Sequence, residues 1–164
     1  MDRQQVQIRQ ARKSDIKDLL RLQREFETYL QSLTDKKRNG LSTAEHERRF
    51  IENGFGKKPA FRTLIARKEG KALGYIAYHF GYDPDEMEGK VVYVIDLFVR
   101  DSTRGMGVGT SLMDSVADIC KEQGGIAVYF GVWNKNKAAI TFYKKLGAEF
   151  VIETPFMMWP KSKW

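Results

Sequence analysis

Residues 104–110 read RGMGVGT and could bind a phosphate group through the main chain. Gly105, Gly107 and Gly109 alternate with other residues, so a ligand can approach much of this backbone closely. The apolar run 91–99, VVYVIDLFV, precedes the stretch, and a segment with helical periodicity follows it. The first N–H groups of a helix lack partners inside the helix and lie at the positive end of its dipole. The sequence therefore predicts an anion-binding corner between a strand and a helix.

The spacing of the glycines distinguishes this corner from two common nucleotide-binding loops. A P-loop has Gly, four residues and then Gly-Lys-Ser/Thr, but no Lys follows Gly109. A dinucleotide fingerprint runs Gly-x-Gly-x-x-Gly, whereas the glycines here run Gly-x-Gly-x-Gly. The pattern that remains is Arg-x-x-Gly-x-Gly, carried by Arg104, Gly107 and Gly109.

Three other titratable side chains could take part in chemistry. Asp96 is a carboxylate inside an otherwise apolar run. Because burying an unpaired charge is costly, such a residue has either a function or a partner, and a structural salt bridge is the alternative to a catalytic role. His79 is expected on the neighbouring strand, and His46 is expected on the surface of a helix. Two histidines without a carboxylate cluster predict no metal site.

Residues 82–90, YDPDEMEGK, predict an acidic loop immediately before the apolar run. Such a loop would attract a cationic ligand. A solvated acidic loop without a ligand is the alternative.

The length and composition predict one globular domain that spans residues 1–164. No apolar run approaches the roughly 20 residues of a membrane span, and the polar N-terminus is unlike a signal peptide, so no membrane partner is expected. The single cysteine, Cys120, suits the cytoplasm and is expected in the core. The net charge is +7, but the basic residues are scattered without a recognisable motif, so no nucleic-acid partner is expected.

Periodicity and turn signals predict a mixed α/β sheet with the element order β-α-α-β-β-β-α-β-α-β. Three consecutive strands in the middle indicate antiparallel pairing, and the later strand–helix–strand unit indicates a parallel pair. Ser14, Ser42 and Asn136 are expected to cap helices. The strands are expected at 6–9, 61–67, 72–80, 91–99, 127–132 and 150–157, and the helices are expected to end near residues 30, 53, 123 and 146.

Two motifs resemble those of the GNAT superfamily of N-acetyltransferases, which bind acetyl-CoA. The Arg-x-x-Gly-x-Gly corner is similar to the family's pyrophosphate-binding loop. Residues 136–148, NKAAITFYKKLGA, are similar to its Asn-x-x-Ala-x-x-Phe-Tyr-x-Lys-x-Gly segment. The element order is also the one that this fold implies, with strands splayed apart where CoA enters. Segments 53–59, 82–84 and 89–99 further resemble the diamine branch, which includes spermidine/spermine acetyltransferases.

The resemblance implies acetyl-CoA as the cosubstrate, with no metal. Residues 104–110 would bind the pyrophosphate, and main-chain groups at the end of the preceding strand would bind the pantetheine arm. The residues that the resemblance assigns to CoA are Leu97, Phe98, Val99, Arg104, Gly105, Met106, Gly107, Val108, Gly109, Thr110, Asn136 and Tyr143.

The resemblance also implies acetyl transfer to a primary amine of a small cationic substrate such as a polyamine or diamine. Tyr143 would protonate the departing thiolate, since a phenol with a pKa of about 10 is protonated at neutral pH. A core aromatic residue beside Phe142 is the alternative. Asp96 would act in catalysis and, with Asp83, would bind the substrate. Direct attack is expected, with no acyl-enzyme on Cys120.

One departure from the branch leaves the general base open. The branch usually carries Glu immediately before the acid that Asp96 matches, and this chain has Ile95 there. A chain of waters, Asp96 itself, Glu27 or His79 could serve instead. Acetylation of proteins or peptides, and a non-catalytic acyl-CoA-binding module, are the alternatives for function. A cytoplasmic homodimer is expected.

Overall fold

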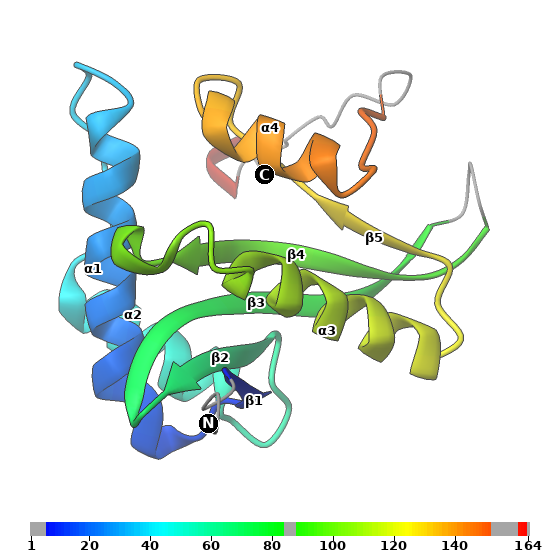
Figure 1. Ribbon diagram of the computed structural model, residues 1–164. Coiled ribbons are helices and arrows are strands. Elements are labelled where there is room, and N and C mark those ends of the chain that lie inside the picture. Colours follow the sequence, from blue (N-terminus) through cyan, green and yellow to red (C-terminus); the bar gives the residue numbers. More distant parts are fainter. Residues whose placement is uncertain (1–5, 84–87, 152–160, 164) are drawn as a thin grey trace. The chain divides into compact units, whose positions relative to one another are not determined.

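A computed structural model of the chain describes residues 6–83, 88–151 and 161–163 (Figure 1). It divides into two compact units, Met1–Gly131 and Val132–Trp164, and each is described by itself. Within the described ranges, no helix combines the length and the apolar character that a membrane crossing needs.

The first unit contains a five-stranded sheet, and the second contains one α-helix. The strands are β1 (Gln7–Gln10), β2 (Arg62–Lys68), β3 (Lys71–Asp83), β4 (Gly89–Val99) and β5 (Ala127–Phe130). The α-helices are α1 (Ile16–Ser32), α2 (Thr43–Arg49), α3 (Val108–Glu122) and α4 (Lys137–Lys145). Short helical turns are η1 (Lys13–Asp15), η2 (Phe50–Gly54), η3 (Asp101–Thr103) and η4 (Lys161–Lys163).

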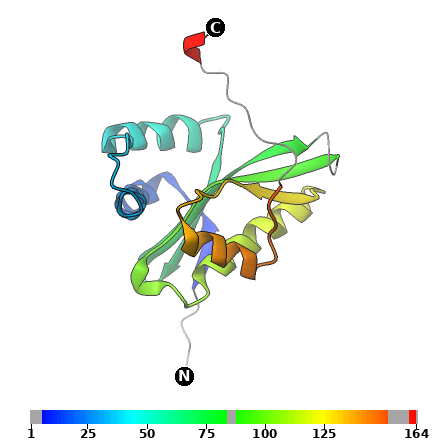
Figure 2. The same ribbon diagram turned by 90° about the horizontal axis from the view of Figure 1, so that it is seen from above.

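The strands are ordered β1-β2-β3-β4-β5. Neighbours from β1 to β4 are antiparallel, and β5 lies parallel to β4, so both predicted pairing types are confirmed. Glu69 and Gly70, both with positive φ, form the predicted tight turn between β2 and β3. The β3–β4 pair is the longest in the sheet and extends past α1 and α2 (Figure 2).

The predicted element boundaries are close to the observed ones, and Ser42 caps α2 in the predicted capping box with Glu45. Three features differ from the prediction. Ser14 does not cap α1, because it lies inside η1, where the Asp15 carboxylate accepts the Arg12 N–H instead. The second helix ends as the π-helical turn η2. Most of the predicted strand 150–157 lies outside the described residues, and Phe150 and Val151 are not in a strand.

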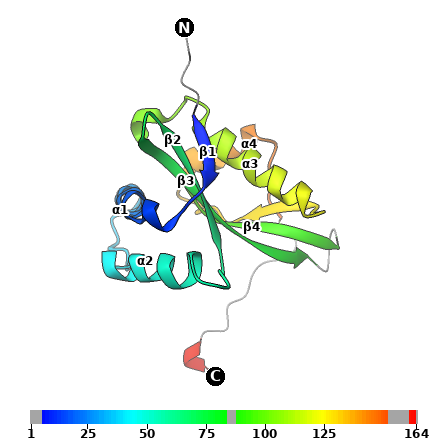
Figure 3. The same ribbon diagram turned by 90° about the horizontal axis from the view of Figure 1, so that it is seen from below.

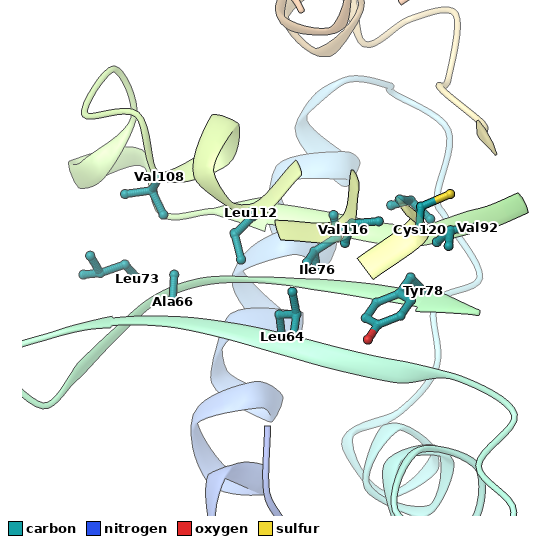
Figure 4. Close-up of a cluster of buried hydrophobic side chains, with 11 residues drawn as sticks. Leu64, Ala66, Leu73, Ile76, Tyr78, Val92, Val108, Leu112, Val116 and Cys120 are labelled. Atoms are coloured by element: carbon teal, nitrogen blue, oxygen red, sulfur yellow. The ribbon is translucent and has the colours of Figure 1, made fainter. Parts of the chain in front are cut away.

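Helices cover both faces of the sheet, as the non-alternating apolar run in β4 predicts. Helix α3 packs on one face, and α1 and α2 lie on the other (Figure 3). On the α3 face, Leu112 and Val116 are fully buried against Ile76 (Figure 4). Cys120 belongs to the same cluster, so its expected place in the core is confirmed. The cluster on the other face is formed by Ala11, Leu19, Leu22, Phe50, Phe61, Ile65, Ala72, Tyr75, Ala77 and Phe98.

Pairing between β4 and β5 is short and leaves the end of β4 open on one side. It begins at Val91 with Ala127 and ends at Val94 with Phe130. The five residues of β4 that follow Val94 have no β5 partner among the described residues. In Figure 1, β5 runs away from β4 towards its end, which is the splayed arrangement that the fold resemblance implies.

Candidate active site

The glycine corner has the left-handed backbone that its sequence suggested. Gly105 has φ 78° and Gly107, the residue that caps α3, has φ 80°. The turn before the helix is closed by the amides of Thr103, Arg104 and Met106. Among the described residues, the amides of Gly105 and Gly107 donate no hydrogen bond. The first amide of α3 that bonds to the corner is that of Ser111, which donates to the Gly107 carbonyl at 2.9 Å. Several N–H donors at the start of α3 are therefore available to an anion.

Arg104 is fixed by contacts from three directions. Its Nη1 lies 2.6 Å from the Asp101 carboxylate, and its Nε donates to the Val99 carbonyl at 3.2 Å. Its guanidinium also lies over the Tyr29 ring of α1, 4.5 Å from the centroid. These contacts connect the corner to the open end of β4 and to α1, while the side chain stays about two-fifths exposed.

Side chains anchor the open end of β4 on both faces. Leu97 and Val99 pack against the α3-side core, and Phe98 is buried on the other face, with its ring 5.4 Å from that of Phe26. Because the side chains hold the strand, the backbone groups on the β5 side can serve a ligand without unravelling the sheet.

A β-bulge at Ile95 turns Asp96 towards α1 and α2. Ala77 pairs with Asp96 but the next residue, Tyr78, pairs with Val94, so Ile95 is the extra residue. Val94 faces the α3-side core, yet Phe98 faces the α1-side core, which shows that the alternation reverses at the bulge. Asp96 therefore lies on the α1 and α2 face, while Ile95 is 42% exposed.

Asp96 is held by two helices. Its Oδ2 accepts a hydrogen bond from Gln23 Nε2 of α1 at 3.1 Å and from Arg49 Nη2 of α2 at 3.2 Å. Gln23 is 2% exposed and donates also to the Tyr75 hydroxyl, at 2.7 Å. Complete burial, and next the charge of Asp96, raise the pKa of Tyr75 well above its usual range. The structural salt bridge that the sequence suggested as an alternative is thus present, between Asp96 and Arg49. This salt bridge does not conflict with a role for Asp96 in the site.

Gln23 and Arg49 are residues of this site that were not predicted from the sequence. For Gln23 the sequence did carry a signal, because a glutamine on the otherwise apolar side of the first predicted helix indicates a polar partner on the sheet that the helix covers. Arg49 gave no signal, because the fold rather than the spacing brings α2 to β4. Its guanidinium also lies over the Phe61 ring at 5.0 Å, which orients it towards Asp96.

The expectation that His46 lies on the surface is wrong. His46 is 4% exposed, and neither ring nitrogen has a hydrogen-bond partner in the described chain. It lies one turn before Arg49 on α2, so both side chains face the same way. Burial, and next the charge of Arg49, lower the pKa of His46. The imidazole is therefore neutral near pH 7.

Asp83 and His79 belong to a different part of the same sheet face. Tyr129 donates its hydroxyl to Asp83 at 2.5 Å, and Asp83 is only 9% exposed, so it is not a solvated loop acid. His79 and Tyr93 stack at 5.1 Å, and Tyr93 and Tyr129 stack at 5.6 Å. Asp83 lies six residues along β3 from the partner of Asp96, about 20 Å at strand spacing. The two acids cannot hold one ammonium group together.

The second unit contains the other two predicted site residues. Asn136 caps α4 as expected, because its side chain accepts the Ala139 N–H at 3.1 Å. Tyr143 packs beside Phe142 at 5.2 Å, and burial raises the pKa of Tyr143 to about 12. Its phenol therefore remains protonated throughout the neutral range.

No group of three or more His, Cys, Asp or Glu side chains that could hold a metal ion occurs in residues 6–83, 88–151 and 161–163.

Comparison with known proteins gives a family and named relatives. The profile of the Acetyltransferase (GNAT) family matches residues 18–148. A thialysine N-epsilon-acetyltransferase of Mus musculus is 31% identical over 157 residues, which cover 91% of this chain and 87% of that protein. A spermidine/spermine N(1)-acetyltransferase-like protein of Homo sapiens is 30% identical over 149 residues, covering 87% of this chain and 20% of that protein.

Solved structures share the fold at lower identity. An integron cassette protein from V. cholerae superposes with a TM-score of 0.79 at 24% identity, covering 96% of this chain and 94% of that one. An aminoglycoside N-acetyltransferase in complex with CoA superposes with a TM-score of 0.77 at 19% identity, covering 94% of each chain.

Proposed function

Because the chain belongs to the Acetyltransferase (GNAT) family and is an N-acetyltransferase, we propose that its acceptor is a primary amine of a small cationic substrate. The acceptor would be a diamine or polyamine that attacks directly in a ternary complex. The observation that carries the proposal is the open end of β4, which Arg104 connects to the glycine corner.

Acetyl-CoA is the cosubstrate that family members use, and it supplies the activated acetyl group. The donors at the start of α3 suit its pyrophosphate, since positive φ at Gly105 and Gly107 turns bare backbone towards solvent. Leu97 and Val99 would present main-chain groups to the amide-rich arm. The full set of proposed CoA contacts is residues 97–99 and 104–110 in the first unit, with Asn136 and Tyr143 in the second.

Tyr143 would give a proton to the departing sulfur. A phenol with a pKa of about 12 is fully protonated at neutral pH, so it can act as a general acid in every turnover. Cys120 is 4% exposed, and its Sγ lies 3.3 Å from the Ala127 carbonyl, which supports direct transfer without an acyl-cysteine.

Two named relatives support a diamine-like acceptor. One acts on thialysine, and the other is like spermidine/spermine acetyltransferases. Asp96 would orient an ammonium or amine group at the end of β4, and Asp83 would interact with a second cationic group farther along the same face. Acids about 20 Å apart favour a long substrate or two separate contacts.

The test is thiol release from acetyl-CoA over a panel of thialysine, spermidine, short diamines, neutral amines and peptides. We expect the highest kcat/KM with a diamine or polyamine. A peptide as the best substrate would favour protein acetylation, and binding of CoA without turnover on any amine would favour a non-catalytic module. Light scattering of the same preparation tests the proposed homodimer.

A further inference from the structure

We propose that His46 is the general base: it accepts the proton that the substrate ammonium must lose before the amine can attack. This inference rests on the proposed function. It replaces the carboxylate that the resemblance would place at position 95 with an imidazole from α2.

His46 is buried, and it has no hydrogen-bond partner among the described residues. It is 4% exposed, and both ring nitrogens lack a hydrogen bond in the described chain. A buried polar group that is unsatisfied costs about 1–3 kcal/mol, so natural proteins keep one where a water or ligand reaches it or where it acts. Among the described residues, the buried amides Asn136 and Gln23 both have protein partners. Arg67 Nε also lacks a hydrogen bond, but the same guanidinium pairs with Asp15 through Nη2, whereas both polar atoms of His46 are unpartnered.

Charged side chains from α1, α2 and β4 surround the imidazole of His46. The ionised groups that act on it are Glu27 from α1, Arg49 and Glu45 from α2, and Asp96 from β4. Asp96 belongs to the open end of the strand where the amine is proposed to react, and Arg49, one turn after His46 on α2, donates to it at 3.2 Å. Burial and Arg49 keep the ring neutral near pH 7, which is the form that accepts a proton.

The other candidate bases fit less well. Asp96 Oδ2 already accepts hydrogen bonds from Gln23 and Arg49, so this carboxylate is engaged with two helices of the protein. Glu27 faces the Arg38 guanidinium at 3.9 Å and is about one-third exposed. His79 stacks on Tyr93, away from the residues that hold Asp96.

The protons balance over one turnover. A water between the ammonium group and His46 would carry the first proton to the imidazole, which later returns it to solvent. The neutral nitrogen then forms its bond to the acetyl carbon, and the C–S electron pair leaves with sulfur, which takes the proton of Tyr143. The proton that nitrogen loses as the amide forms replaces the one that Tyr143 gave. The net reaction releases one proton per ammonium substrate.

The test compares two diamines with the same carbon skeleton, of which only one must lose a proton before it can attack. 1,3-Diaminopropane is protonated at neutral pH, whereas the fluorines of 2,2-difluoro-1,3-diaminopropane leave its amines largely neutral at pH 8. We expect His46→Gln to lower kcat/KM for the first by about 10²–10⁴ and for the second by less than about tenfold. An equal loss with both acceptors would show that His46 only supports the fold, and no loss would overturn the proposal.

The pH profile is the second readout. Because 1,3-diaminopropane binds as the ammonium form and only neutral His46 can take its proton, log kcat/KM should rise with a slope of about one below the pKa of His46 and become level above it. His79→Gln is the matched control, because these are the two histidines of the chain, and it should keep the break. A wild-type profile without a break, or one that disappears in His79→Gln, would reject the proposal even if His46→Gln did not fold. Absence of turnover with every amine would instead reject the proposed function.

Discussion

Replacing Gly107 by alanine should weaken CoA binding more than it weakens the fold. Gly107 has φ 80°, and a Cβ added there would meet no other atom within 4 Å. The cost is therefore backbone strain, about 1–2 kcal/mol for a residue with a side chain in the left-handed region. Relief of that strain would rotate the amides at the start of α3 away from the pyrophosphate.

The size of the effect can be calculated for a thermal-shift assay. CoA at about 100 times its Kd stabilises the native state by about 2.7 kcal/mol. A tenfold weaker Kd in Gly107→Ala would reduce this to about 1.4 kcal/mol at the same CoA concentration. For a domain of this size, the CoA-induced rise in Tm would fall from about 5–11 °C to about 3–6 °C.

Gly124→Ala is the matched control. Gly124 follows the other end of α3 with φ 69°, and a Cβ there also meets no atom within 4 Å. It should lower the Tm of the free protein about as much as Gly107→Ala does, yet leave the CoA-induced rise unchanged. An undiminished CoA shift in Gly107→Ala, or a shift with NAD or ATP in place of CoA, would refute the assignment of the corner.

Three further substitutions test the site and the fold. Tyr143→Phe should keep CoA affinity and packing beside Phe142 but lower kcat by about 10²–10⁴; unchanged turnover would mean that the sulfur takes its proton by another route. Asp96→Asn should lower kcat/KM for diamines about 10- to 100-fold, the value of a charged hydrogen bond, while neutral amines change little; equal losses for both would argue against amine recognition. Asp15 is 3% exposed and accepts from Arg9, Arg67 and the Arg12 amide, so Asp15→Asn should cost about 3–5 kcal/mol in urea unfolding at pH 7. Chiefly the Arg9 hydrogen bond holds the pKa of Asp15 well below its usual range. The ionised Asp15 carboxylate therefore contributes its full stabilisation above the unfolded carboxyl pKa of about 4, and this stabilisation is lost as the pH falls below that value. Asp15→Asn should no longer show this part of the acid-induced loss of stability.

Local signals predicted most of the fold. Alternating glycines before an apolar periodicity predicted both the corner and α3, because backbone freedom and helix dipole act within a few residues. The capping box at Ser42 and the turn at Glu69-Gly70 were predictable for the same reason. Ser14 was misassigned, because the short turn η1 precedes α1 and contains Ser14. The neighbouring Asp15 carboxylate does not cap α1 either, since it binds the Arg12 amide and the Arg9 and Arg67 side chains.

The chemistry around Asp96 could not be read from spacing, because it depends on register. Strict alternation would place Asp96 on the same face as Val94, inside the α3-side core. The bulge at Ile95 moves it to the face where Gln23 and Arg49 lie. His46 looked like a surface residue for a related reason: α2 is short and polar, and its buried side is defined by α1 and β4 rather than by its own sequence.

This arrangement also changes how the substrate is selected. Arg49 neutralises Asp96, and Asp83 is 9% exposed beneath the Tyr129 hydroxyl, so neither acid projects a free charge far into solvent. In a chain with a net charge of +7, long-range attraction of a polyamine is therefore weak. Discrimination between amines must come from desolvated contacts at short range, which salt screens little. The KM for a diamine should then change less than about twofold between low and physiological ionic strength. A steep rise of KM with salt would mean that an exposed acid, such as Glu88 before β4, selects the substrate instead.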